Sequence, residues 1–134
     1  MDTAHENPSQ GFSLNCMELQ AYQPNRYPYL MTDHVDEVVP GKSARGYKNL
    51  TMNEWYFPGG PNMPGALQLE ALAQMLTVAI TTLPGLKGKV THALQHTVRY
   101  RKEVLPDKKF EIEHRSAVLA PGHLQRPWHR SRGW

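Results

Sequence analysis

Residues 63–74 read Met-Pro-Gly-Ala-Leu-Gln-Leu-Glu-Ala-Leu-Ala-Gln, and this stretch decides the fold. It predicts a helix over residues 64–82, because a proline is tolerated in a first helical turn, where its missing N–H would have no partner. Apolar residues then fall on nearly every side, so we expect the helix to be surrounded by protein at the centre of the fold. Glu70 is the exception, since a buried carboxylate costs free energy unless something uses it.

Two interpretations of Glu70 are open from the residues alone. The carboxylate reaches solvent or caps backbone groups, or it belongs to a site that performs acid or base chemistry. Gln74 and then Thr77 lie near Glu70 on the helix surface. Gly65 favours a site, because a glycine at a helix start lets a ligand approach N–H groups that have no helical partner.

The segments on either side of this helix alternate as strands do. Upstream, we expect strands at residues 35–39 and 44–51, joined by a turn at Pro40 and Gly41. Downstream, period-two patterns predict long strands at residues 90–101 and 110–118, antiparallel to each other. This order predicts an α+β fold in which an antiparallel sheet is wrapped around one long helix.

Length and composition limit the remaining possibilities. The 134 residues suffice for one domain, which we place at residues 25–119, after a loose polar leader at 1–24 and before a basic irregular tail at 120–134. The leader contains one short helical piece near residues 14–21. Cys16 is the single cysteine, which excludes an internal disulfide, and the first residues lack the pattern of a signal peptide, so we expect a cytoplasmic protein.

The charge pattern excludes some partners. A formal net charge of +3 is too small to imply nucleic-acid binding. No apolar run reaches the roughly 20 residues that a membrane span needs. Basic residues gather modestly at 99–109, where they form either a solvated face or a dock for an acidic partner.

Histidines and carboxylates that could suggest a metal do not share a site. His92 and His96 would lie on one strand face about 13 Å apart, too far to share one ion, so we interpret them as core or interface residues. Alternation likewise splits a charged group at the start of the first predicted strand, which comprises Asp33, His34, Asp36 and Glu37. We therefore expect no metal.

Three stretches of the chain form motifs of their own. They are residues 25–33, Asn-Arg-Tyr-Pro-Tyr-Leu-Met-Thr-Asp, residues 57–74, Phe-Pro-Gly-Gly-Pro-Asn-Met-Pro-Gly-Ala-Leu-Gln-Leu-Glu-Ala-Leu-Ala-Gln, and residues 98–107, Val-Arg-Tyr-Arg-Lys-Glu-Val-Leu-Pro-Asp. They resemble the 3-hydroxyacyl-[acyl carrier protein] dehydratases of the FabZ/FabA type, which have the hotdog fold. The second stretch is similar to the family signature Phe-Pro-Gly-x-Pro-x-Met-Pro-Gly-x-Leu-x-x-Glu-Ala-x-Ala-Gln, and the other two resemble its opening and a later strand and turn. The resemblance covers roughly residues 20–119.

The resemblance implies elimination of water from a 3-hydroxyacyl thioester without a cofactor. Glu70 would serve the leaving hydroxyl, the Gly65 N–H would hold the thioester carbonyl, and Gln74 would support the carboxylate. Phe57 and Met63 would contact the substrate. The thioester would be carried by acyl carrier protein or coenzyme A, and a homodimer or higher oligomer is the family's arrangement.

The chain departs from the family pattern in two places. Tyr56 occupies the position of the family's catalytic histidine, in a loop with several residues fewer, and a phenol with a pKa near 10 is a poor base. After Leu119 the strand pattern stops, so the C-terminal strands are missing or altered, which we interpret as a change such as a frameshift.

The first departure leaves two alternatives to dehydration. One is a hotdog thioesterase in which Glu70 activates water. The other is a non-catalytic acyl-binding or partner subunit, in which Glu70 complements a histidine from another chain in a heteromer.

Overall fold

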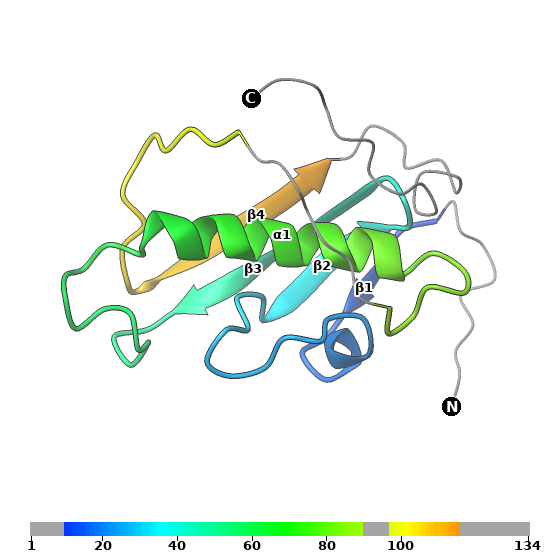
Figure 1. The fold of residues 1–134 in the computed structure, drawn as a ribbon, viewed down its shortest axis with the longest axis horizontal. Helices are drawn as coiled ribbons and strands as arrows, with labels where there is room; N and C mark the ends of the chain where they lie inside the picture. The colour runs from blue at the N-terminus through cyan, green and yellow to red at the C-terminus, as the bar shows by residue number, and fades with distance from the viewer. Residues whose placement is uncertain (1–9, 90–96, 116–134) are drawn as a thin grey trace, which may run out of the picture.

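A computed structural model of the chain describes residues 10–89 and 97–115. Its elements are β1 (Phe12–Leu14), a short 3-10 helix η1 (Glu18–Ala21), β2 (His34–Val39), β3 (Ser43–Leu50), α1 (Gly65–Thr81) and β4 (Lys108–Arg115). The four strands form one antiparallel sheet in the order β1-β2-β3-β4. Figure 1 shows α1 lying across one face of this sheet, which confirms the predicted α+β class.

The hairpin of β2 and β3 is attached to the end of α1. Gly41 takes a φ of 74°, a left-handed conformation that favours glycine, in the turn between the two strands. Its N–H donates to the carbonyl of Ala79 at 2.8 Å. The tight turn predicted at Pro40 and Gly41 therefore also fixes the hairpin against the helix.

The core lies between the sheet and one side of α1. The sheet contributes Val35, Val38, Ala44, Leu50 and Ile112, and the helix contributes Ala71, Met75, Val78 and Ala79. The opposite side of α1 carries half-buried leucines at positions 69, 72 and 76. Among the described residues, α1 is therefore enclosed on its sheet side and also at Gln74 and Thr81, which are buried against the segment before β2. The side that carries the three leucines is only half-buried, so the expected burial on nearly every side is observed in part.

Three elements match their predicted ranges. The helix expected at residues 64–82 is α1, and the strands expected at 35–39 and 44–51 are β2 and β3. The strand expected at 110–118 corresponds to β4, whose described part ends at Arg115. β4 pairs along its whole length with β3. Its pairing with the segment 90–101 stays a prediction, because residues 90–96 lie outside the described residues.

The strand predicted at residues 90–101 is not found where the structure describes that segment. Residues 90–96, with His92 and His96, lie outside the described residues, and residues 97–101 form no strand. The physical reason is that the following backbone bonds to the helix entry instead. The Met63 N–H donates to the Val104 carbonyl at 2.8 Å, and the Val104 N–H donates to Asn62 Oδ1 at 2.8 Å.

The polar leader is not loose over its described part. β1 pairs with β2, and Leu14 and Leu19 are buried. The helical piece expected near residues 14–21 is η1, and Asn15 holds the chain just before it: its side-chain oxygen accepts the Glu18 N–H at 2.9 Å, and Glu18 Oε2 accepts the Asn15 N–H at 2.9 Å. The tail expected at residues 120–134 lies outside the described residues. No helix in the described part has the length and apolarity needed to span a membrane.

His114 places an imidazole on the inner face of β4. It follows Phe110 and Ile112 on that face, and its Nε2 is buried without a hydrogen-bond partner in the described part of the chain. Burial lowers the pKa of His114 below its ordinary value of 6.5, because the charged form is poorly solvated there. The folded state therefore favours the neutral imidazole.

We predict that His114→Leu reduces the loss of stability of this protein at mildly acidic pH. As pH falls below about 6.5, the unfolded chain binds the His114 proton more readily than the folded chain, so the free energy of unfolding decreases. Urea unfolding between pH 5 and pH 7.5 measures this slope in the wild type and the variant. Phe110→Leu, on the same strand face, changes packing without a titrating group and should keep the wild-type slope; equal slopes in all three proteins would contradict the prediction.

Candidate active site

The start of α1 is held by contacts that favour a glycine. Pro64 precedes the helix with φ −54° and ψ 137°, and its carbonyl accepts the Gln68 N–H at 3.1 Å. The Tyr100 hydroxyl donates to the Gly65 carbonyl at 2.8 Å. A Cβ at position 65 would lie 2.7 Å from Tyr100 Cζ. Gly65 therefore lets an aromatic ring lie directly against the first turn, whose N–H groups have no helical partner.

Glu70 is oriented by a buried amide one turn further along. Gln74 Nε2 donates to Glu70 Oε1 at 2.9 Å and to the Tyr29 carbonyl at 2.6 Å. Gln74 Oε1 accepts the Met31 N–H at 2.8 Å. Because Gln74 is only 1% exposed, its amide cannot exchange these partners for water, and it holds one oxygen of the half-buried Glu70 carboxylate in place.

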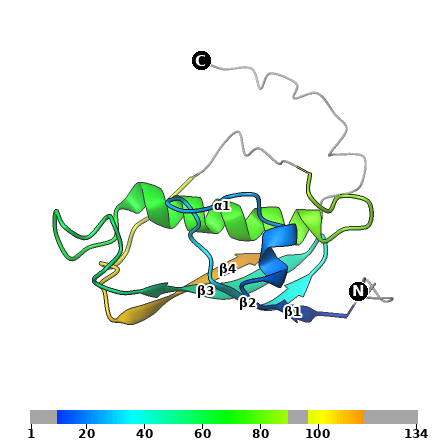
Figure 2. The ribbon, with the colours of Figure 1, turned by 90° about the horizontal axis from the view of Figure 1, so that it is seen from below.

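The segment between η1 and β2 carries these backbone partners, and we call residues 22–31 the strap. Figure 2 shows it running alongside α1. Two further contacts attach it to the helix: Gln23 Nε2 donates to the Gln74 carbonyl at 3.3 Å, and Thr81 Oγ1 donates to the Tyr22 carbonyl at 2.9 Å. The strap is therefore bound along most of the helix, from Thr81 back to the Glu70 turn.

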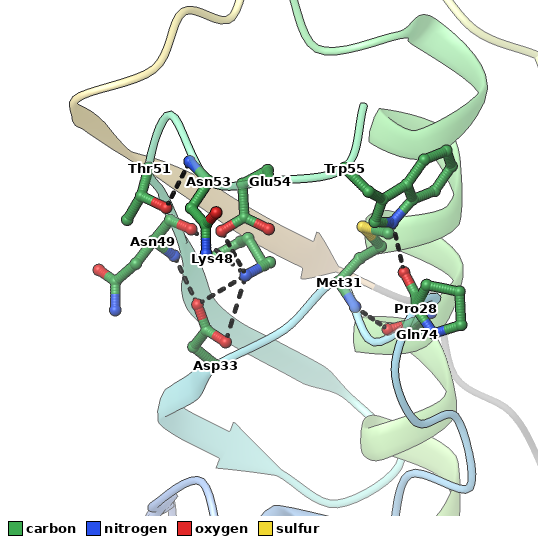
Figure 3. A network of polar contacts seen from close by, with 10 residues as sticks. All are labelled: Pro28, Met31, Asp33, Lys48, Asn49, Thr51, Asn53, Glu54, Trp55 and Gln74. Atoms are coloured by element: carbon green, nitrogen blue, oxygen red, sulfur yellow. Dashed lines mark hydrogen bonds and ion pairs between the residues drawn. The ribbon is translucent and has the colours of Figure 1, made fainter. Parts of the chain in front are cut away.

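A buried lysine lies at the far end of β3, and with Asp33 and Glu54 it forms what we call the Lys48 cluster. Lys48 Nζ is 3.2 Å from Asp33 Oδ2 and 3.5 Å from Glu54 Oε1, and it also donates to the Asn49 carbonyl at 3.3 Å. Asp33 Oδ2 in turn accepts the Asn49 N–H at 2.7 Å. Figure 3 shows these groups converging beside the loop that leads to α1. Lys48 is only 8% exposed, and two carboxylates and one backbone carbonyl surround its ammonium group.

Tyr56 lies beside this cluster and is only 8% exposed. Its hydroxyl has no hydrogen-bond partner among the described residues. Burial raises the pKa of Tyr56 well above its ordinary value of 10, and the carboxylates of Glu54 and Asp33 raise it further. The phenol is therefore neutral at physiological pH and cannot act as a base, and the charges that act on it belong to the Lys48 cluster.

The structure brings together some of the predicted site residues and separates others. Gly65, Glu70 and Gln74 follow one another along α1, and the amide of Gln74 contacts Glu70 directly. Phe57 and Met63, 3% and 0% exposed, belong to the hydrophobic core rather than to an open surface, and their contact with substrate stays a prediction.

The charged residues at the start of β2 do not act as one group. Asp33 binds Lys48, whereas His34 Nε2 lies 3.6 Å from Asp36 Oδ1. In the described part of the chain, no group of three or more histidines, cysteines and carboxylates is arranged to hold a metal ion.

Sequence reasoning missed several residues that shape the site. Lys48 had a signal, because it occupies an inward position of β3 between Gly46 and Leu50, where a charge needs a partner. Trp55 and Tyr100 had no such signal in the sequence, because both act through contacts with distant segments. Trp55 Nε1 donates to the Pro28 carbonyl at 2.7 Å, and the Tyr100 hydroxyl donates to the Gly65 carbonyl.

Comparisons with known proteins show the family to which the chain belongs. The model of a family described as the FabA-like domain matches residues 23–120, which include β2, β3, α1 and β4. A protein of Clostridium novyi (strain NT) named 3-hydroxyacyl-[acyl-carrier-protein] dehydratase FabZ is 42% identical over 106 residues, covering 75% of each chain. Proteins of the same name from Moorella thermoacetica and Nitratidesulfovibrio vulgaris are 43% identical over 100 residues and 42% identical over 113 residues. These matches cover 71% and 79% of this chain and 70% and 73% of the relatives.

We predict that Lys48→Met destabilises the fold by about 3 kcal/mol, because removing one partner of a buried ion pair leaves the other charges uncompensated. Urea unfolding at neutral pH measures the change. Arg115→Met is the matched control: Arg115 Nε lies 2.7 Å from Glu113 Oε1, but both side chains are exposed, and such pairs contribute roughly 0–1 kcal/mol. Equal effects of the two substitutions would show that the Lys48 cluster does not stabilise the loop.

Proposed function

Because this chain belongs to the FabA-like family, we propose that it is a 3-hydroxyacyl-[acyl carrier protein] dehydratase of the FabZ type, with Glu70 as its proton-transfer residue. The observation that carries the proposal is the Glu70–Gln74 pair, held at 2.9 Å by an amide whose other contacts are satisfied within the protein. The names of the relatives support the same reaction and the same carrier.

The reaction removes water from carbons 2 and 3 of the acyl chain. The bond from carbon 2 to hydrogen and the bond from carbon 3 to oxygen break, a double bond forms between the two carbons, and water leaves. Negative charge develops on the thioester carbonyl as the first bond breaks, and the Gly65 N–H at the start of α1 would stabilise it. The protonated form of Glu70 would donate its proton to the leaving hydroxyl.

The proton on carbon 2 needs a base, and a neutral buried Tyr56 does not supply one. We therefore assign both transfers to Glu70: its carboxylate takes the proton from carbon 2 and returns it to the hydroxyl on carbon 3. General acid or base catalysis by a positioned group contributes typically 10²–10⁴-fold, so we expect turnover slower than in a site with two titrating residues. We also propose a homodimer or higher oligomer as the working assembly.

We predict that the purified chain converts 3-hydroxyacyl thioesters of acyl carrier protein or coenzyme A to trans-2-enoyl thioesters, and that Glu70→Gln lowers the rate at least about 100-fold. Glutamine keeps a hydrogen-bonding side chain but cannot accept and return a proton. Enoyl absorbance and free thiol are followed together, and light scattering gives the mass of the assembly. Glu111→Gln, an exposed carboxylate on β4, is the control and should keep the wild-type rate.

Other outcomes of this assay identify other functions. Free thiol from a saturated acyl thioester would indicate hydrolysis, and acyl binding without either product would indicate a non-catalytic subunit. Enoyl formation only after a histidine-bearing relative is added would indicate a heteromer that supplies the missing base.

We predict that Tyr56→His raises the rate of dehydration by less than about threefold, far below the typical contribution of a positioned base. The reason is geometric, because the side chain at position 56 packs between Trp55 and Phe57 and faces the carboxylates of the Lys48 cluster. Steady-state rates of the two proteins at pH 7.5 test this expectation. A gain of tenfold or more would mean that the side chain at this position reaches carbon 2 of the substrate.

A further inference from the structure

Trp55 is exposed and yet firmly held. The residue is 44% exposed, while its Nε1 donates to the Pro28 carbonyl at 2.7 Å. Its ring meets the Tyr29 ring edge to face, with centroids 5.9 Å apart, and the Tyr56 ring in the same manner at 5.5 Å. We call Tyr29, which is 55% exposed, and Trp55 the aromatic platform. Its rings are fixed in orientation before anything covers them.

The aromatic platform adjoins the Glu70 carboxylate. The carbonyl of Tyr29 and Oε1 of Glu70 accept hydrogen bonds from the same nitrogen, Gln74 Nε2, at 2.6 and 2.9 Å. The backbone of Tyr29 is therefore no more than two hydrogen-bond lengths from the carboxylate. Figure 3 shows Trp55 over Pro28, with Gln74 beside that same segment of the strap.

These contacts determine what the aromatic platform can bind. A substrate whose carbon 3 lies at Glu70 extends an alkyl chain away from the carboxylate. The nearest part of the aromatic platform is the Tyr29 backbone, whose carbonyl shares Gln74 Nε2 with Glu70, and the half-exposed Tyr29 ring lies against Trp55. Fixed aromatic rings offer a large apolar contact at little cost in side-chain entropy. Every methylene that they remove from water strengthens binding up to about fourfold.

We propose that Tyr29 and Trp55 contact the acyl chain of the substrate and set its preferred length. This inference rests on the proposed function of Glu70, since it is the carboxylate that brings the acyl group to the platform. Trp55 belongs to the loop between β3 and α1, so the preference is a property of this chain's own loop sequence.

The test measures binding rather than turnover. Calorimetry gives the dissociation constants of unreactive acyl-pantetheine thioethers with 4, 8 and 12 acyl carbons for the full-length protein and its variants. Trp55→Ala should weaken binding of the 12-carbon ligand about tenfold, which is the loss of roughly two buried methylenes, and change the 4-carbon ligand less than about twofold. Trp55→Phe keeps a ring but loses the bond to Pro28, and it should give an intermediate loss; it also preserves the test if the alanine variant does not fold.

Tyr27→Ala is the matched control, because Tyr27 is an aromatic residue of the same strap and is 86% exposed. It should leave all three dissociation constants unchanged. Three results would overturn the proposal. The first two are an equal loss of affinity at every chain length and no loss of affinity for the 12-carbon ligand. The third is a change in oligomeric mass while the dependence of affinity on chain length stays the same, which would assign the platform to a second copy of the chain. If the wild type binds none of the ligands, the proposed function itself fails, whereas length-dependent binding that Trp55→Ala leaves intact overturns the platform alone.

Discussion

The side-chain amide of Gln74 is the interaction on which the site depends. Both of its ends are used, by the Met31 N–H on one side and by the Tyr29 carbonyl and Glu70 on the other. A buried polar group that loses its partner costs about 1–3 kcal/mol, so neither the strap nor the carboxylate can move independently of the helix. The position of Glu70 is thus coupled to the path of a segment more than forty residues away in the sequence.

The parts of the fold that the sequence predicted are those that local chemistry specifies. Proline and glycine begin α1, Leu83-Pro84-Gly85 follows its end, and the turn at Gly41 separates two short strands. What the sequence did not predict concerns partners distant in sequence. The pairing of β4 with β3 was not foreseen, because alternation reveals which residues share a face but not which strand lies alongside.

The contacts of the site also fall into those that local sequence predicts and those that it does not. The contact of Glu70 with Gln74 follows from the four-residue spacing of a helix and was predicted. The strap carbonyl at Tyr29 and the ring of Tyr100 against Gly65 had no local signal, since each joins the helix to a segment at least 35 residues away. Burial of Leu14 and Leu19 was missed for a related reason: two isolated leucines in a polar stretch form no periodic pattern, although each fills part of the core.

The loop between β3 and α1 keeps Tyr56 a neutral phenol. Glu54 is held by Lys48 and Trp55 is held by Pro28, so Tyr56 follows two consecutive anchored residues. Burial beside the carboxylates of Glu54 and Asp33 keeps the phenol protonated. Anchoring and electrostatics therefore act together: the charged residues that hold the loop also disfavour ionisation of Tyr56. In the proposed reaction this leaves proton transfer to Glu70, and the proposed contribution of the loop is the apolar surface of Trp55.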